Sequence, residues 1–289
     1  MRPPALSLSF RHVLAIVLAQ LLALVAQAWL SRLLVAHGYG ELQAHYLAYL
    51  VVPPILLPML APVLLEHREF LQRLFSPRGL TLRLALAAVG LGITLRIVWW
   101  SLLIARVALG MAVNDDPQAV AGPVLSFACP PLPSLLLGLL VMAILIPFME
   151  ETVHRGLVQS AFVHRGPLPA ILVSAVIFTA FHPPSSYGWV FFMGVVLGIQ
   201  FWLAGSLWAT ILTHATYNGL IQLDWRCLQG RWNPSPDSLP QLVPAMIALA
   251  TLAAALLLVI VILRAQRTGA RANPAPATAA NQARSRHAR

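Results

Sequence analysis

The sequence contains few charged side chains and no lysine. Charged residues make up 10% of the chain, against about 25% in a typical soluble domain. All 19 basic residues are arginine, whereas hydrophobic residues make up 59% of the chain and the mean hydropathy is +0.78. This composition excludes an ordinary soluble domain. We attribute the absence of lysine to codon usage in a GC-rich, bacterial genome, and we expect no nucleic-acid partner.

Long apolar runs follow one another along the chain. Several of them contain windows of roughly 17 to 25 apolar residues, enough to cross a hydrocarbon core about 30 Å thick. The first run is too long for a signal peptide and lacks a small-residue cleavage site, so we expect a retained helix. We therefore predict an all-α fold, a polytopic transmembrane helical bundle in contact with membrane lipid. It has about eight spans, at 12–34, 45–65, 84–110, 133–162, 168–182, 187–204, 206–223 and 240–263.

The arginines are distributed unevenly between the loops. The 66–83 loop carries four of them, and the segment 264–289 carries six and no acid. The 111–133 loop has no basic residue and contains Asp115 and Asp116. Because basic loops stay in the cytoplasm, this pattern predicts an integral protein of the bacterial inner membrane with both termini cytoplasmic. The basic tail is rich in alanine and proline, and we expect it to be disordered.

Cysteine is nearly absent. The two cysteines, Cys129 and Cys227, are both predicted on the non-cytoplasmic side, where two unrelated thiols are favoured over a disulfide. We expect the chain to consist of three N-terminal spans over 1–130, a segment over 131–225 that carries the candidate site residues discussed below, a loop and last span over 226–263, and the tail 264–289.

Two acids stand out against this apolar background. Seven of the nine acidic residues fall in loops or at span ends, but Glu150 and Glu151 lie in FMEETVHRG, within one long predicted helix. Ionisable groups at membrane depth are costly and are functional candidates by default. Side chains four apart share a helix face, so we expect Glu151 beside Arg155 and Glu150 beside His154. In the simplest interpretation, Glu151 and Arg155 form an ion pair that fixes the helix. Glu150 is then free to face a cavity and act as a general base.

A short turn, VHRGP at 163–167, connects this helix to the next predicted helix, which carries His182. Glu150 and His182 are each sixteen residues from Gly166, a helical distance of about 24 Å, so a hairpin brings them to the same depth. Pro183 and Pro184 follow His182, which predicts that the helix ends or breaks there. His182 then lies either near the far surface or at the edge of a wet cavity.

A second histidine lies in LTHATYNG. His214 and Asn218 are four residues apart on one face of a predicted helix. Together they can hold a water molecule, an oxyanion or a metal ion. The alternative is a buried pair that only joins two helices.

Together these segments resemble the CAAX-protease and bacteriocin-processing family of intramembrane proteases, the type II CAAX prenyl endopeptidases. The resemblance covers roughly residues 133–223. The family pattern is Glu-Glu-x-x-x-Arg, Phe-x-x-x-His and His-x-x-x-Asn, each on its own helix. In this sequence the matching residues are Glu150, Glu151, Arg155 and Gly156; Phe178 and His182; and His214 and Asn218.

The resemblance implies an intramembrane endopeptidase with defined roles for these residues. Glu150 and His182 would activate water, and His214 and Asn218 would stabilise the oxyanion. Glu151 and Arg155 would be structural or contact substrate. His154 departs from the family pattern, which usually has an apolar or aromatic residue there.

The sequence leaves the cofactor open. The family has been described both as metalloproteases and as metal-independent glutamate proteases. Two histidines and a glutamate, here His182, His214 and Glu150, could make a zinc site. Because a glutamate that ligates zinc is not simultaneously a free base, we favour metal-independent chemistry over Zn²⁺.

Other functions also fit parts of the sequence. A non-catalytic immunity or scaffold protein could keep the same fold and polar cluster. A proton-coupled transporter is disfavoured because no symmetric pair of broken helices is visible. If the protein is an enzyme, we expect its substrate to be a membrane-associated protein or peptide. The reaction would be CAAX-type processing or the processing of a bacteriocin or surface protein.

Overall fold

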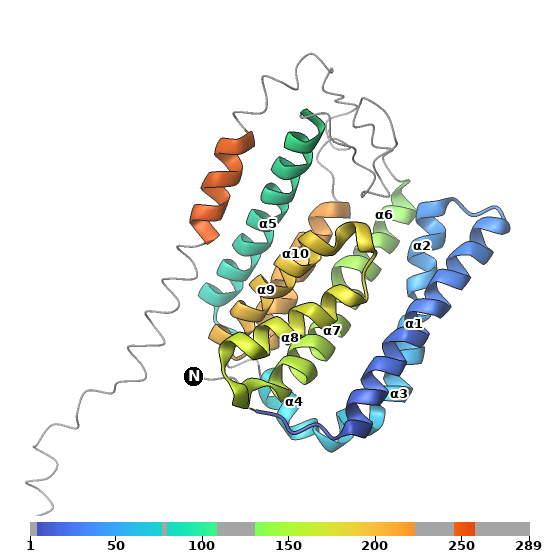
Figure 1. Ribbon diagram of the computed structural model, residues 1–289. Coiled ribbons are helices and arrows are strands. Elements are labelled where there is room, and N and C mark those ends of the chain that lie inside the picture. The colour runs from blue at the N-terminus through green and yellow to red at the C-terminus, as the bar shows by residue number, and fades with distance from the viewer. Residues whose placement is uncertain (1–4, 77–79, 109–130, 223–245, 258–289) are drawn as a thin grey trace, which may run out of the picture.

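The computed structural model describes residues 5–76, 80–108, 131–222 and 246–257. Within these ranges all regular secondary structure is helical (Figure 1), which confirms the predicted all-α class. Cys129, Cys227 and the tail 264–289 lie outside the described residues. The helices are α1 (Phe10–Ala36), α2 (Glu41–Tyr49), α3 (Val52–Glu66), α4 (Arg68–Leu74), α5 (Leu82–Ala108), α6 (Leu132–Gly138), α7 (Ile146–Glu151), α8 (Pro167–Ala180), α9 (Tyr187–Ala204) and α10 (Leu207–Gln222).

In the part of the chain that the structure describes, five helices are long and apolar enough to cross a membrane, by length and composition. They are Phe10–Ala36, Glu41–Glu66, Leu82–Trp99, Leu132–Gln159 and Pro184–Ala204. The helical membrane bundle is thus confirmed, but the predicted count of about eight spans is not. The 14 residues of α8 reach only about 21 Å at 1.5 Å per residue, short of a full hydrocarbon core. The last predicted span is described only over Met246–Leu257.

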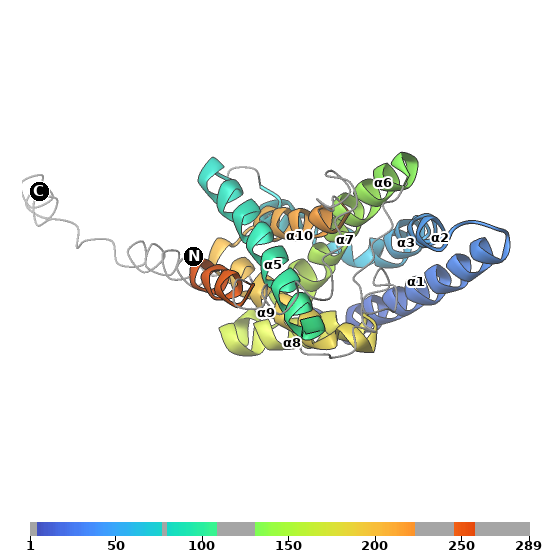
Figure 2. The same ribbon diagram turned by 90° about the horizontal axis from the view of Figure 1, so that it is seen from above.

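The helix that carries α6 and α7 packs against other helices on two sides and leaves a further face exposed. α1 packs on α2 and α3, α8 packs on α9, and α10 packs on α5. Figures 1 and 2 show α7 between the α1–α3 group and the α5, α9 and α10 group. Leucines and valines remain exposed along the outer helices, for example Leu14, Leu18 and Val25 of α1. Such apolar outer faces suit contact with lipid.

Small residues allow neighbouring helices to approach closely. A Cβ built at Gly194 of α9 would lie 3.1 Å from Cα of Ala175 in α8. A Cβ at Gly92 of α5 would lie 2.6 Å from the carbonyl oxygen of Thr213 in α10, and the Thr213 hydroxyl donates to the Ala88 carbonyl at 2.9 Å. Close packing of this kind is typical of membrane helices. It fixes α10, and therefore His214, against α5.

Candidate active site

The helix that carries the paired glutamates changes its winding on both sides of them. α7 is flanked by two π-helical segments, Leu139–Leu145 and Thr152–Gln159. Segments of this kind inside α-helices occur frequently at functional sites. The two neighbouring carboxylates have different surroundings, because Glu150 retains 27% of its side-chain exposure and Glu151 retains none.

Glu151 lies at the centre of a buried polar network. Its Oε1 accepts hydrogen bonds from Nη1 of Arg155 and from Nδ1 of His214, both at 2.9 Å. The other guanidinium nitrogen, Nη2, donates to the Gly194 carbonyl at 3.1 Å. The ion pair predicted from the spacing of Glu151 and Arg155 is confirmed. The network joins the glutamate helix to α9 and α10, and it offsets the charge of a carboxylate removed from solvent.

Glu150 is the accessible carboxylate. Its Oε2 lies 3.8 Å from Nε2 of His214, too far for a direct hydrogen bond. Thus the two glutamates approach opposite nitrogens of one imidazole ring. Glu151 holds Nδ1 from the buried side, and Glu150 faces Nε2 from the accessible side.

The partners of the two histidines define their tautomers. A carboxylate paired with arginine and a backbone carbonyl both only accept hydrogen bonds. Nδ1 of His214 therefore donates to Glu151, and Nδ1 of His182 donates to the Phe178 carbonyl at 2.8 Å. In their neutral forms both rings carry the lone pair on Nε2. This is the arrangement found in histidines that ligate metals or accept protons.

Phe178 brings the remaining residues together. Its ring centroid lies 4.6 Å from that of His182 and 6.0 Å from that of His214, and the Arg155 guanidinium carbon lies 4.7 Å from it. α8 ends at Ala180, two residues before the predicted end at His182. No ion pair joins Glu150 and His182 in the described part of the chain. They are related only through shared neighbours, because Glu150 faces His214 and the ring of Phe178 packs on both histidines.

His154 differs from the expectation. The ring is 3% exposed and packs edge-on against Phe178 at 5.1 Å. It also lies 6.4 Å from the Phe181 ring, and within the described residues no ion pair links it to Glu150. The winding becomes π-helical at Thr152, which rotates the side chains that follow relative to α-helical spacing. The long Arg155 side chain still reaches its glutamate, whereas the shorter His154 faces the aromatic rings.

The Asn218 side chain donates to the backbone carbonyl of Met142, which has no backbone N–H partner because residue 147 is proline. In the preceding π-helical segment hydrogen bonds run from residue i to i−5, as from the Ile146 N–H to the Val141 carbonyl. The next donor would be the N–H of residue 147, aimed at Met142, but proline has none. Nδ2 of Asn218 instead donates to the Met142 carbonyl at 2.9 Å. One amide hydrogen of Asn218 is thus used to hold the side chain in place.

Replacing Pro147 with alanine should restore the missing donor and weaken the orientation of Asn218. The new N–H would compete for the Met142 carbonyl, and loss of a hydrogen bond worth about 1 kcal/mol corresponds to roughly fivefold slower turnover. The measurement is the rate, in purified protein, of the peptide cleavage that the sequence resemblance implies. Pro58→Ala, a second proline inside a helix, is the matched control. Equal rates for the two variants would show that Pro147 does not position Asn218.

The sequence did not reveal every part of this network. The Gly194 carbonyl that binds Arg155 and the Met142 carbonyl that binds Asn218 are backbone groups without a side-chain signal. Tyr46 of α2 also donates to Gln222 at the end of α10. Neither partner occurs in a recognisable motif.

The fold and site define an integral membrane protein with a buried acid, histidine, arginine and amide cluster at its centre. Residues 132–220 match the sequence model of the family described as type II CAAX prenyl endopeptidase Rce1-like. The match runs from the start of α6 into α10, contains every candidate site residue, and confirms the predicted resemblance. It supports a CAAX-type intramembrane protease in general. No curated protein and no solved structure matches the chain.

Proposed function

We propose that this protein hydrolyses a peptide bond of a membrane-associated protein or peptide, acting within the bacterial inner membrane with both termini cytoplasmic. Glu150 and His182 activate the attacking water, and His214 and Asn218 stabilise the oxyanion. The observation that carries the proposal is the accessible Glu150 carboxylate facing Nε2 of His214, while Glu151 fixes the opposite nitrogen of the same ring.

The proposed mechanism separates proton transfer from stabilisation of the oxyanion. Glu150 removes a proton from water as the oxygen attacks the scissile carbonyl, and the proton then passes to the leaving nitrogen. The carbonyl oxygen gains negative charge, which the second amide hydrogen of Asn218 stabilises. His214 donates to that oxygen only when its Nε2 is also protonated. The buried Glu151 carboxylate stabilises the resulting imidazolium, so its proposed role is positioning and charge compensation.

The residue geometry favours a reaction without a metal ion. Glu150, His182 and His214 offer the donor types of a zinc site, and a bound zinc would act as a Lewis acid on the scissile carbonyl. However, the set of three such donors found within 4.8 Å of one another in the described residues is a different one, His12, Glu66 and His67. The three active-site donors would have to move closer together to share an ion.

Removal of metal ions is therefore expected to leave peptide cleavage unchanged. Purified protein would be dialysed against a strong zinc chelator, and its cleavage rate would be compared before dialysis, after dialysis and after zinc is restored. A rate that falls on chelation and returns with zinc would instead assign Glu150, His182 and His214 to a metal. A variant in which His67 is alanine serves as the control for zinc held elsewhere in the protein.

The decisive test of function is the appearance of new protein termini in cells. Cells that carry the wild-type protein or Glu150→Gln at equal abundance would be compared by mass spectrometry of membrane-protein termini. We expect termini that occur only with the wild type, and these would also identify the substrate. Identical termini under several growth conditions would favour the immunity or scaffold role. Loss of a coupled uptake activity without any change in termini would favour a transporter.

A further inference from the structure

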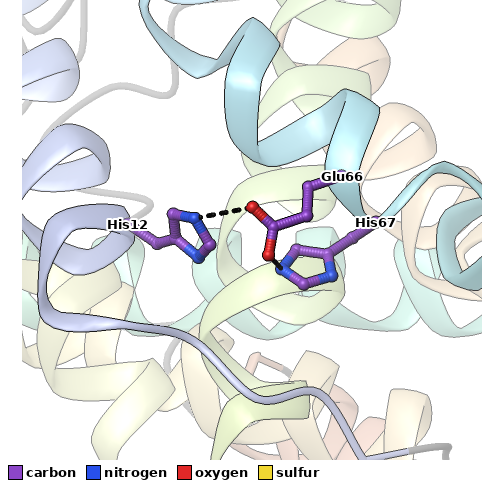
Figure 3. A group of neighbouring side chains, drawn as sticks. All are labelled: His12, Glu66 and His67. Atoms are coloured by element: carbon purple, nitrogen blue, oxygen red, sulfur yellow. Dashed lines mark ion pairs between the residues drawn. The ribbon is translucent and has the colours of Figure 1, made fainter.

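A second cluster of ionisable side chains lies outside the candidate active site, where α1 begins and α3 gives way to α4. Figure 3 shows Glu66 between two histidines. Nε2 of His12 lies 3.1 Å from Oε2 of Glu66, and Nε2 of His67 lies 3.8 Å from Oε1 of the same carboxylate. The two imidazole rings are nearly perpendicular, with centroids 5.4 Å apart.

The chain geometry explains how these residues converge. Neighbouring side chains in a regular α-helix diverge by about 100°. His67, however, has φ −106° and ψ 21° and separates α3 from α4. This break lets His67 and Glu66 face the same neighbour. His12 approaches from the first turn of α1, where Ser9 caps the helix. The cluster lies near the start of the candidate span Phe10–Ala36 and at the end of the candidate span Glu41–Glu66.

We propose that His12, Glu66 and His67 bind a zinc ion. Two imidazoles and a carboxylate are a donor set that zinc prefers, with one position left for water. One ligand atom from each residue lies within 4.8 Å of the others. Donors around a tetrahedral zinc are about 3.3 Å apart, so the cluster must contract. Glu66 can provide this movement because 58% of its side chain is exposed.

The hydrogen bonding of the cluster supports a ligand. Nε2 of His67 is buried and has no hydrogen-bond partner, an unfavourable state for a polar atom unless a ligand satisfies it. Nδ1 of His12 accepts a long hydrogen bond, 3.4 Å, from the Ser9 N–H, so Nε2 carries the proton towards Glu66. Zinc binding at Nε2 would move this proton to Nδ1. The hydrogen bond lost at Nδ1 would be the long one from the Ser9 N–H.

The location of the cluster shows how an ion could reach it and which helices a bound ion would join. Glu66 and His67 line an open cavity of ≈ 300 Å³ together with Leu65, Arg68, Glu69, Phe70 and Arg73, which gives an ion a route from solvent. Leu71 and Leu74 of α4 belong to the same apolar core as Ile16 of α1. A zinc ion would therefore join the start of α1 to the α3–α4 junction. This site shares no residue with the candidate active site.

The test is zinc binding by purified full-length protein that carries no polyhistidine tag. Zinc would be titrated in competition with a coloured chelator of known affinity. His67→Ala and Glu66→Gln should each weaken the binding of one equivalent by roughly tenfold or more. His164→Ala, at an exposed histidine in the 163–165 turn, should not change it. His214→Ala should leave this equivalent in place and thereby separate it from any zinc at the active site.

Thermal unfolding with and without zinc provides a second readout. Zinc should raise the unfolding temperature of the wild type and of His164→Ala, because the ion binds the folded state. It should not raise that of Glu66→Gln, which keeps the size of the side chain and remains informative if His67→Ala fails to fold. Zinc binding and a thermal shift that are the same in wild type and Glu66→Gln would overturn the proposal. The cluster would then be an ion pair between helices.

Discussion

Glu150→Gln is expected to slow cleavage of the substrate by roughly 10²- to 10⁴-fold, the contribution typical of a positioned general base. Glutamine keeps the shape of the side chain but cannot accept the proton of water. The folded state should tolerate this change, since Glu150 is partly exposed and its ion pair with His214 is long, at 3.8 Å. The measurements are the cleavage rate of purified protein and the free energy of unfolding in the same detergent.

Glu41→Gln provides a matched control, because Glu41 is an exposed glutamate in the first turn of α2. It should leave both cleavage and unfolding unchanged. A Glu150→Gln protein that cleaves within a few-fold of the wild-type rate would remove the general-base role. A variant that loses activity and unfolds more easily would show that Glu150 has a structural role instead.

Arg155→Met is expected to lower the free energy of unfolding by roughly 3–5 kcal/mol. Arg155 and Glu151 are both fully buried, and the substitution leaves the carboxylate in an apolar interior without its opposing charge. It also removes the donor to the Gly194 carbonyl. Equilibrium unfolding of the purified protein in mixed micelles with increasing denaturing detergent would measure the change.

The double variant Glu151→Gln with Arg155→Met tests the cause of that loss. Removing both charges should restore part of the stability, since a buried pair is penalised mainly when one member remains. Arg165→Met, at an exposed arginine in the 163–165 turn, is the control and should unfold like the wild type. A small effect of Arg155→Met, or a double variant less stable than the single one, would argue against a buried ion pair that fixes the helix.

The neighbouring residues Glu150 and Glu151 should differ in the property that their substitution changes. Changing Glu150 should affect chemistry with little effect on stability, whereas breaking the Glu151 network should affect stability first. The reason is their burial: one carboxylate has no exposed side-chain surface and the other retains about a quarter of it.

Several features follow from the sequence by itself. Apolar runs determine a helical membrane protein because unpaired backbone groups are too costly in lipid. Four-residue spacing determines the pair of Glu151 and Arg155, since both residues belong to one helix and the arginine side chain is long. The proline after His182 ends α8 nearby. These features depend on local geometry or on the solvent, and neither requires knowledge of distant contacts.

Other features were decided by the tertiary structure. The sequence predicted Glu150 beside His154, but the π-helical turn and the ring of Phe178 direct His154 elsewhere. It did not predict that His214 would lie between the two glutamates, because that contact depends on how closely α10 packs against the glutamate helix. Nor did it predict the cluster of His12, Glu66 and His67, which forms only when α1 packs on α3. Contacts between helices far apart in sequence depend on packing, and side-chain periodicity does not specify them.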